Sequence, residues 1–374
     1  MKNKEISSGE LKAKLEAGDA LEIVDIRETD AYHEWHIPGS TNVPVTHALK
    51  SRQDHALTDR AGSLPKDRPI VTVCRAGVIS QRATAVLDSL GFDVASLTGG
   101  MRSWGAVWTE VRIPLAKHAG ASLIQVRRNG KGCLSYVLES KGEAVVVDPS
   151  VSSEAYMQIA DREGLTLQRV LETHVHADHL SRARDLCRLT GAELVLAKND
   201  RVTFDYTSVS DGDVLTVGDL QVRVLATPGH TGESVCYLVG EELLLSGDTL
   251  FVDAVGRPDL EHGDHGADSL ARTLYASLRQ RLLGRVPDEV AIYPAHHGKP
   301  IGFDGRPVRS TVGELRSSLD LLERGEEEFV TQVLSSLSAK PPNHERIIAI
   351  NEGRERLDVD PLDVEAGPNR CAAG

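Results

Sequence analysis

The sequence predicts an α/β protein in two parts, and three observations carry that prediction. Apolar, β-branched runs alternate with helical patterns in the N-terminal part, which is typical of a parallel sheet flanked by helices. A β-meander then opens the second part near residue 122. Further along, histidine and aspartate side chains repeatedly follow apolar strands and are flanked by glycine or proline. Side chains in such positions lie on loops at the ends of a sheet, where a rigid framework presents binding groups.

Length and composition limit what this protein can be. Its 374 residues are enough for two domains with cores of their own. The 42 Lys and Arg against 55 Asp and Glu give a net charge of −13, which argues against a nucleic-acid-binding surface. No apolar run approaches the roughly 20 residues that cross a membrane, and the first residues lack the apolar core of a signal peptide. The five cysteines are odd in number and form no CxxC pair, so we expect reduced thiols and a cytoplasmic location.

The N-terminal part carries clear element signals. A serine at position 7 or 8 and a glycine at position 18 bound a short helix over residues 8–17. A second helix is expected after residue 80 and ends at Gly91, and its apolar face consists of Ala83, Val86, Leu87 and Leu90. The expected strands, all rich in apolar residues, are residues 21–27, 69–73 and 94–97.

Cys74 stands at the carboxyl end of the central strand, in a short loop that opens onto a helix. Backbone N–H groups and the helix dipole stabilise a thiolate at such a place. Arg75 and Arg82 would add positive potential. A cysteine at a strand end is ordinarily a buried structural residue, so its position alone does not assign a role.

The motifs around this cysteine resemble a rhodanese (sulfurtransferase) domain throughout residues 1–112. They are residues 24–27, 36–40, 74–77 and 97–101, followed by Trp104. The resemblance implies that Cys74 carries a persulfide sulfur taken from a sulfane-sulfur donor, with Arg75 beside the substrate. Many active single-domain rhodaneses have an arginine five residues after the cysteine, whereas this chain has Ile79. An arginine there would hold an anionic donor, so Ile79 argues against thiosulfate but not against a persulfide.

The boundary between the two parts is expected at residues 113–121, which contain a proline and small residues without periodicity. This linker separates a domain over residues 1–112 from a second domain over residues 122–374. Beyond His296, the apolar spacing predicts C-terminal helices in the second domain, with apolar positions at Leu315, Leu319, Leu322, Phe329, Val333 and Leu337.

The strongest signal for chemistry lies in residues 173–179, where three imidazoles and a carboxylate fall within a few positions after an apolar strand. Alternate side chains of a strand share a face, so His174 and His176 emerge together. Asp178 and His179 follow where the chain turns into a helix. Imidazole and carboxylate groups suit zinc, iron or manganese. The other donors, each after an apolar strand, are His230, Asp248 and His296.

These segments, in this order, resemble the metallo-β-lactamase superfamily over roughly residues 119–374. The resemblance implies an αββα sandwich with the metal between its loops, and two interpretations of the metal remain. One is a dinuclear zinc (Zn²⁺) hydrolase of thioesters similar to glyoxalase II, in which Asp248 bridges the two ions. The first ion would take His174, His176 and His296, and the second Asp178, His179 and His230. The other interpretation uses only His174, His230 and Asp248 to hold one Fe(II), which leaves positions open for substrate sulfur and O₂.

Residues outside the donor set resemble the persulfide dioxygenases; they are residues 247–251, 256–260, 274–278 and 293–296. The resemblance implies that one iron oxidises a low-molecular-weight thiol persulfide, such as glutathione persulfide, to sulfite. Around the iron, His176, Asp178, His179 and His296 would then orient ligands and water. Arg257 either meets the anionic substrate or pairs with Asp259. A rhodanese module that serves only for docking is a third hypothesis, and the thiol carrier and a homo-oligomeric state are left open.

Overall fold

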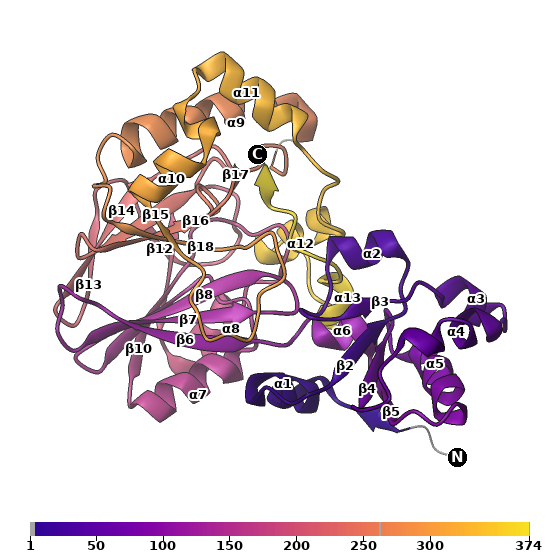
Figure 1. Cartoon of the computed structure of the whole chain (residues 1–374). Helices are drawn as coiled ribbons and strands as arrows, with labels where there is room; N and C mark the ends of the chain where they lie inside the picture. Colours follow the sequence, from indigo (N-terminus) through magenta and orange to yellow (C-terminus); the bar gives the residue numbers. More distant parts are fainter. Residues whose placement is uncertain (1–3, 262, 374) are drawn as a thin grey trace.

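The computed structural model describes residues 4–261 and 263–373, and among these residues the N-terminal part is built on a five-stranded sheet (Figure 1). All its strands are parallel, in the order β1-β5-β4-β2-β3. The strands are β1 (Glu5–Ile6), β2 (Glu22–Asp25), β3 (Thr41–Asn42), β4 (Ile70–Val73) and β5 (Val94–Leu97). The central strand β4 is buried over its whole length, as its apolar, β-branched sequence predicts.

Helices flank this sheet, and the expected ones are present. The first, α1, has a capping box between Ser7 and Glu10 and ends at Gly18 in the left-handed conformation, so the signals in the sequence are confirmed. The helices are α1 (Ser8–Ala17), α2 (Thr29–Glu34), α3 (Thr46–Lys50), α4 (His55–Thr58), α5 (Val78–Ser89) and α6 (Gly100–Trp104), with a 3₁₀ turn η1 (Ala61–Ser63). The segments after β2, β4 and β5 all leave from the same edge of the sheet, because parallel strands share the direction of their carboxyl ends.

The second part consists of two sheets that face each other. The first has the order β12-β11-β10-β9-β8-β7-β6, and the second has the order β13-β14-β15-β16-β18-β19. The first sheet contains β6 (Thr109–Pro114), β7 (Ala121–Arg128), β8 (Cys133–Ser140), β9 (Glu143–Val147), β10 (Thr166–Leu171), β11 (Glu193–Ala197) and β12 (Thr207–Val209). The second contains β13 (Val214–Val217), β14 (Leu220–Ala226), β15 (Val235–Val239), β16 (Leu243–Gly247), β18 (Ala291–Pro294) and β19 (Ser310–Thr311).

Helices cover the outer faces of both sheets, so the predicted αββα sandwich is confirmed (Figure 1). The largest apolar cluster lies between the sheets. Two helices pack on the first sheet: α7 (Ser153–Glu163) and α8 (Ala183–Thr190). The elements on the second sheet are α9 (Gly263–Ala276), the π-helical turn η2 (Ser277–Leu282), α10 (Val312–Ser318), the 3₁₀ turn η3 (Asp320–Glu323) and α11 (Glu326–Ser335).

The expected linker at residues 113–121 needs a correction. Strand β6 pairs with β7 along Thr109–Pro114, so the seven-stranded sheet of the second part already begins inside the predicted first domain. Alternate residues of β6 are exposed, which gave this edge strand the irregular composition of a loop. The chain therefore passes between the two parts before β6.

The C-terminal segment, residues 338–373, returns toward the N-terminal domain. It contains α12 (His344–Asn351), α13 (Pro361–Val364) and β20 (Ala372–Ala373), which pairs with β17 (Val255–Gly256). Arg102 of α6 donates to Asp360 at 2.8 Å and to Asp363 at 2.5 Å. Glu34 at the end of α2 pairs with Arg370. This segment thus ties the edge of the N-terminal sheet to the second domain. No helix within the described ranges is long and apolar enough to span a membrane.

Candidate functional site

His174, His230 and Asp248 converge in the interior, although they follow three different strands. The Nε2 atoms of His174 and His230 lie 3.6 and 3.4 Å from Asp248 Oδ2, and all three side chains are buried. Within the described part of the chain, neither His174 Nε2 nor Asp248 Oδ2 has a hydrogen-bond partner. Buried polar atoms without partners are costly, so their convergence fits a metal ion held between them.

Neighbouring groups set the tautomers of both histidines. His230 Nδ1 lies 2.8 Å from the carbonyl of Arg257, which can only accept, so Nδ1 carries the proton. Thr173 Oγ1 donates its hydrogen to Asp148 at 2.8 Å, so it must accept from His174 Nδ1 at 2.9 Å. Both Nε2 atoms are therefore left with lone pairs that point toward the position between them.

The charges at this position are also suited to a cation. Burial lowers the pKa of His174 well below its usual value, and the neighbouring imidazoles lower it further. Burial likewise lowers the pKa of His230. For Asp248, burial would raise the pKa, but interaction with His296 outweighs burial and lowers it. Two neutral imidazoles and one carboxylate are the protonation states that metal binding requires.

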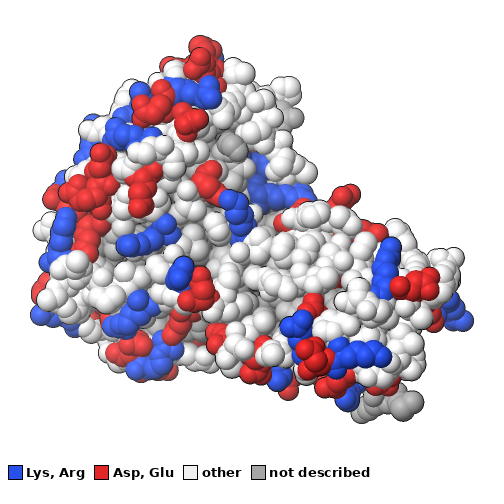
Figure 2. All heavy atoms as spheres, in the orientation of Figure 1, with Lys and Arg blue, Asp and Glu red and all other residues white. Residues whose placement is uncertain are grey.

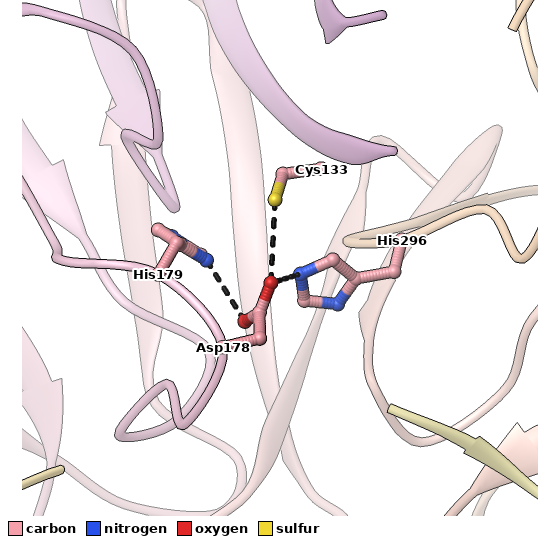
Figure 3. A group of neighbouring side chains, drawn as sticks. All are labelled: Cys133, Asp178, His179 and His296. Atoms are coloured by element: carbon pink, nitrogen blue, oxygen red, sulfur yellow. Dashed lines mark hydrogen bonds and ion pairs between the residues drawn. The ribbon is translucent and has the colours of Figure 1, made fainter. Parts of the chain in front are cut away.

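A second group of donors lies beside the first and consists of Cys133, Asp178, His179 and His296 (Figure 3). Asp178 is at its centre. It accepts from Cys133 Sγ at 3.3 Å, and its oxygens lie 3.0 Å from His179 Nδ1 and 3.1 Å from His296 Nε2. His296 Nδ1 also lies 2.6 Å from Asp248 Oδ1, so this histidine joins the two groups.

The distribution of donors proposed for a dinuclear site is wrong in three places. His296 belongs with Asp178 and His179 rather than with His174, and His230 belongs with His174. His176 lies in a third group, because its Nε2 lies 3.1 Å from Glu172 and 3.3 Å from Asp148. Spacing along the chain predicted the donors but not their grouping, which depends on side-chain rotamers at the strand ends.

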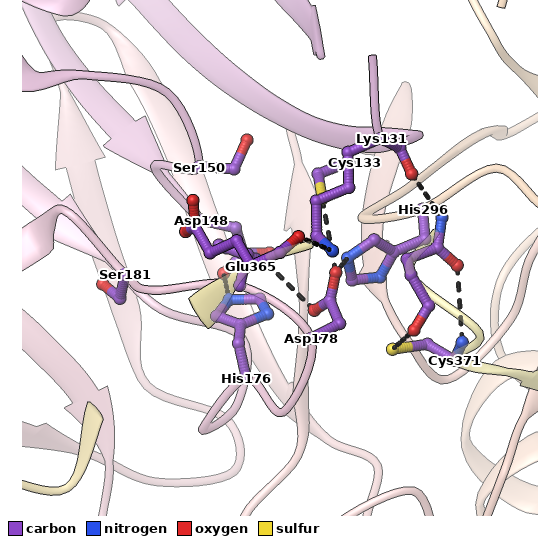
Figure 4. Close-up of polar contacts among 12 residues, drawn as sticks. Lys131, Cys133, Asp148, Ser150, His176, Asp178, Ser181, His296, Glu365 and Cys371 are labelled. Carbon is purple, nitrogen blue, oxygen red and sulfur yellow. Dashed lines mark hydrogen bonds and ion pairs between the residues drawn. The ribbon is translucent and has the colours of Figure 1, made fainter. Parts of the chain in front are cut away.

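Sequence reasoning missed three residues at this site, namely Cys133, Glu365 and Cys371 (Figure 4). Cys371 brings its Sγ within 4.8 Å of donor atoms of Asp248 and His296. Cys133 opens β8, and its backbone forms a bridge with that of His296. Neither cysteine has a motif around it, and both reach the site through long-range packing, so no local signal pointed to them.

Glu365 ties the C-terminal segment to the loop that carries the donors. Its carboxylate accepts from Leu180 N at 2.7 Å, directly after His179, and from Arg128 Nη2 at 2.9 Å and Arg182 Nη2 at 3.1 Å. Burial would raise the pKa of this carboxyl, but Arg128 and Arg182 outweigh burial and lower it to about 2. The carboxylate is thus ionised and fully engaged.

We expect Glu365→Gln to lower the free energy of unfolding at neutral pH by about 3 kcal/mol, because Arg128 is left buried without its charge partner. The native pKa lies below the usual 4.5, so the contribution is complete above pH 4.5 and is lost as the pH falls toward 2. Denaturant unfolding over a pH series should show the variant and the wild type converging in that window. Glu327→Gln, at an exposed ion pair with Arg272, is the control and should change little. A pH-independent difference would contradict the assignment.

Cys74 lies at the amino terminus of α5, as predicted, with its thiol turned toward the helix. Its Sγ accepts from Ser80 N at 3.4 Å and lies 3.3 Å from Ser80 Oγ. The loop is held by close backbone packing, because a Cβ on Gly100 would lie 2.2 Å from the carbonyl oxygen of Cys74. The side chain of Arg75 is exposed, whereas Arg82 is engaged by Asp54 at 2.7 and 2.9 Å.

Arg257 pairs with Asp259, which is the structural one of its two expected roles. It is 1% exposed, its guanidinium donates to both oxygens of Asp259, and it also reaches the carbonyls of Ser338 and Arg370. These contacts anchor the C-terminal segment, and they leave the side chain enclosed.

Comparison with protein families assigns both parts of the chain. Residues 7–107 match the model of the rhodanese-like domain, and residues 128–330 match that of the metallo-beta-lactamase superfamily. Among solved structures, a metallo-beta-lactamase from Staphylococcus aureus subsp. aureus COL superposes with a TM-score of 0.57 and 27% identity, covering 62% of this chain and 72% of that one. ETHE1 from Myxococcus xanthus superposes with a TM-score of 0.53 and 26% identity, covering 66% of this chain and 99% of that one.

Relatives of known name include both an oxygenase and hydrolases. The mitochondrial persulfide dioxygenase ETHE1 of Bos taurus is 31% identical over 239 residues, which are 61% of this chain and 87% of that protein. A hydroxyacylglutathione hydrolase of Prochlorococcus marinus is 34% identical over 176 residues, and a beta-lactamase hydrolase-like protein of Xylella fastidiosa is 31% identical over 189. These matches cover 44% and 45% of this chain, and only 65% and 42% of the two hydrolases.

Proposed function

Because this chain belongs to the metallo-beta-lactamase superfamily and carries a rhodanese-like domain, we propose that it oxidises a low-molecular-weight thiol persulfide to sulfite with iron and O₂. Sulfane sulfur would be transferred through Cys74. The observation that carries the proposal is the group of His174, His230 and Asp248, in which His174 Nε2 and Asp248 Oδ2 have no hydrogen-bond partner within the described part of the chain. The relative named hydroxyacylglutathione hydrolase supports a glutathione-type thiol, and the relative named persulfide dioxygenase supports a persulfide as substrate.

These three residues would hold one Fe(II), which when bound supplies open positions for a persulfide sulfur and O₂. The chain's own groups prepare the site. The carbonyl of Arg257 and the hydroxyl of Thr173 keep both Nδ1 atoms protonated, and His296 Nδ1–H occupies the second oxygen of Asp248. The donors are at most 3% exposed, so the surrounding protein keeps bulk water away from the reacting groups.

In the N-terminal domain, the thiolate of Cys74 would attack the terminal sulfur of a persulfide. One S–S bond forms as the donor's S–S bond breaks, and the donor leaves as a thiol after taking up a proton. The amide of Ser80 and the amino terminus of α5 stabilise the negative sulfur before and after the transfer.

A dinuclear zinc hydrolase of thioesters is the second candidate, and the group of Asp178, His179 and His296 beside the first triad favours it. Elemental analysis of anaerobically purified protein, with an oxygen electrode and a thioester assay in parallel, separates the two. About one iron per chain and persulfide-dependent oxygen uptake are expected. Two zinc ions, thioester hydrolysis and no such oxygen uptake would overturn the dioxygenase proposal.

Replacing Ile79 with arginine is expected to raise the thiosulfate sulfurtransferase activity several-fold. A guanidinium binds an oxyanion through paired hydrogen bonds, and Arg82 cannot replace it while Asp54 engages it. Steady-state rates with thiosulfate and cyanide measure the effect, and Ile79→Lys controls for charge without the planar geometry. An unchanged rate in the folded arginine variant would show that Arg75 already serves the anion.

A further inference from the structure

We propose that Arg201 is a positioning residue for the metal centre, because it holds the carboxylates that fix the loops of His174 and His230. We call residues 172–181, between β10 and α8, the first donor loop, and residues 227–234, between β14 and β15, the second donor loop. The inference rests on the metal triad of the proposed function and not on the reaction that the metal supports.

Glu233 joins the two donor loops. It belongs to the second donor loop, three residues after His230, and its Oε1 accepts from the backbone N–H of Val175 at 3.0 Å. Val175 stands between His174 and His176 in the first donor loop. The side chain of Glu233 is only 6% exposed. One enclosed carboxylate therefore fixes the separation of the two backbone segments that carry the imidazoles of the triad.

Glu261 is a second carboxylate that holds the second donor loop. Its Oε2 accepts from the backbone N–H of Gly232 at 2.6 Å, two residues after His230. Glu261 lies a few residues beyond Arg257, whose carbonyl contacts His230 Nδ1 at 2.8 Å. The loop of His230 is thus fixed both at its backbone and at its imidazole by the same stretch of chain.

Arg201 binds both of these carboxylates at once. It lies between β11 and β12, and its Nη1 donates to the two oxygens of Glu233 at 3.0 and 2.9 Å. The same Nη1 lies 3.2 Å from Glu261 Oε1. Because each carboxylate accepts from the backbone of a donor loop, Arg201 acts on both loops through its two partners.

A third carboxylate extends this arrangement to the C-terminal segment. Arg201 Nε donates to Glu352 at 2.8 Å, directly after the last residue of α12. That last residue, Asn351, donates its amide N–H groups to the carbonyls of His176 and His179 at 2.9 Å each. Arg201 therefore also fixes the end of the helix that holds the first donor loop.

The enclosure of this cluster distinguishes it from other ion pairs of the protein. Figure 2 shows acidic and basic side chains interspersed over the face of the molecule drawn there, and exposed pairs of this kind contribute little. By contrast, the side chain of Arg201 is 15% exposed, and those of its three partners are 4–9% exposed. Carboxylates that are withdrawn from water repel one another unless a cation lies between them. Loss of Arg201 should therefore displace the three carboxylates and the backbone that they hold.

Arg201→Gln tests the proposal, because it removes the charge and keeps a polar side chain. The dissociation constant of Fe(II) is measured anaerobically on the metal-free full chain, with Zn²⁺ in a parallel series. We expect the Kd to rise about tenfold, as when partners that orient metal ligands are replaced. The sign is decisive, because the loss of a nearby cation would by itself favour a divalent ion and lower the Kd.

A double-mutant cycle with Glu233→Gln tests whether Arg201 acts through Glu233. Glu233→Gln should also raise the Kd about tenfold. The double variant should lose about as much affinity as the weaker-binding single variant, and not the product of the two losses. Arg201→Lys keeps the charge without the planar guanidinium, so it should recover part of the lost affinity.

Arg112→Gln is the control, because Arg112 also pairs with two carboxylates, Glu139 on β8 and Glu163 on α7. The free energy of unfolding of each metal-free variant is measured alongside. An unchanged or lowered Kd in Arg201→Gln would overturn the proposal, and so would additive losses or an equal loss in Arg112→Gln. If Arg201→Gln does not fold, an unchanged Kd in Glu233→Gln has the same consequence.

Metal binding requires no turnover, so this test is separate from that of the proposed reaction. Weaker binding of Fe(II) by both variants, in a protein without persulfide-dependent oxygen uptake, would leave the positioning role intact while the proposed dioxygenase function fails.

Discussion

Asp248→Ala is expected to remove the metal and to lower persulfide-dependent oxygen uptake by more than about 100-fold. Replacing a residue that only hydrogen-bonds to a metal ligand typically lowers metal affinity or activity 10–100-fold. Asp248 is itself the carboxylate on which both histidine Nε2 atoms converge, so the loss should be larger. Without it, His174 and His230 retain no charge that offsets a divalent cation. The measurement is the iron content of anaerobically purified protein, together with an oxygen electrode.

His296→Ala provides the graded comparison for this prediction. His296 contacts Asp248 Oδ1 but stands outside the triad, so we expect a 10–100-fold loss of activity with most of the iron retained. Asp253→Ala, at an ion pair with Lys299, is the control and should behave like the wild type. Iron retained in Asp248→Ala would show that another donor set holds it, with Asp178 and His179 as the nearest alternative.

Cys74→Ser is expected to abolish sulfur transfer to the level of the uncatalysed reaction. The Cys74 thiol lies at the amino terminus of α5 with the amide of Ser80 donating to it, whereas a serine hydroxyl at the same place is neither a thiolate nor able to hold a sulfane sulfur. Mass spectrometry of tryptic peptides after incubation with polysulfide should show one added sulfur atom on the peptide with Cys74.

Cys187→Ser is the matched control for sulfur loading. Burial raises the pKa of the Cys187 thiol to about 12, so little thiolate forms there at neutral pH and the substitution should leave transfer intact. Equal loading of all five cysteines, with unchanged transfer by Cys74→Ser, would favour a rhodanese domain that serves only for docking.

The sequence was sufficient for the order of elements and for the types of donor. Periodicity and capping placed α1 between Ser7 and Gly18, and the alternation of strands and helices predicted the parallel sheet. The loops that carry His230, Asp248 and His296 were recognisable because glycine or proline stands at or just after the end of each strand. Each of these signals depends only on residues that are close together in the sequence, so the sequence alone is sufficient to detect it.

Long-range packing decided the remaining features. The grouping of His296 with Asp178 rather than with His174, and the position of His176 between Glu172 and Asp148, depend on which rotamers the two facing sheets allow. The contacts of Glu365 with Leu180 and Arg128 join residues more than 180 positions apart in the chain.

The same reason explains the domain boundary. The composition of β6 is that of a linker, and only its pairing with β7 identifies it as a strand. An edge strand is stabilised by its neighbour and not by its own composition. Residue types and strand ends were thus determined by the sequence itself, whereas the partners of each side chain were determined by tertiary packing.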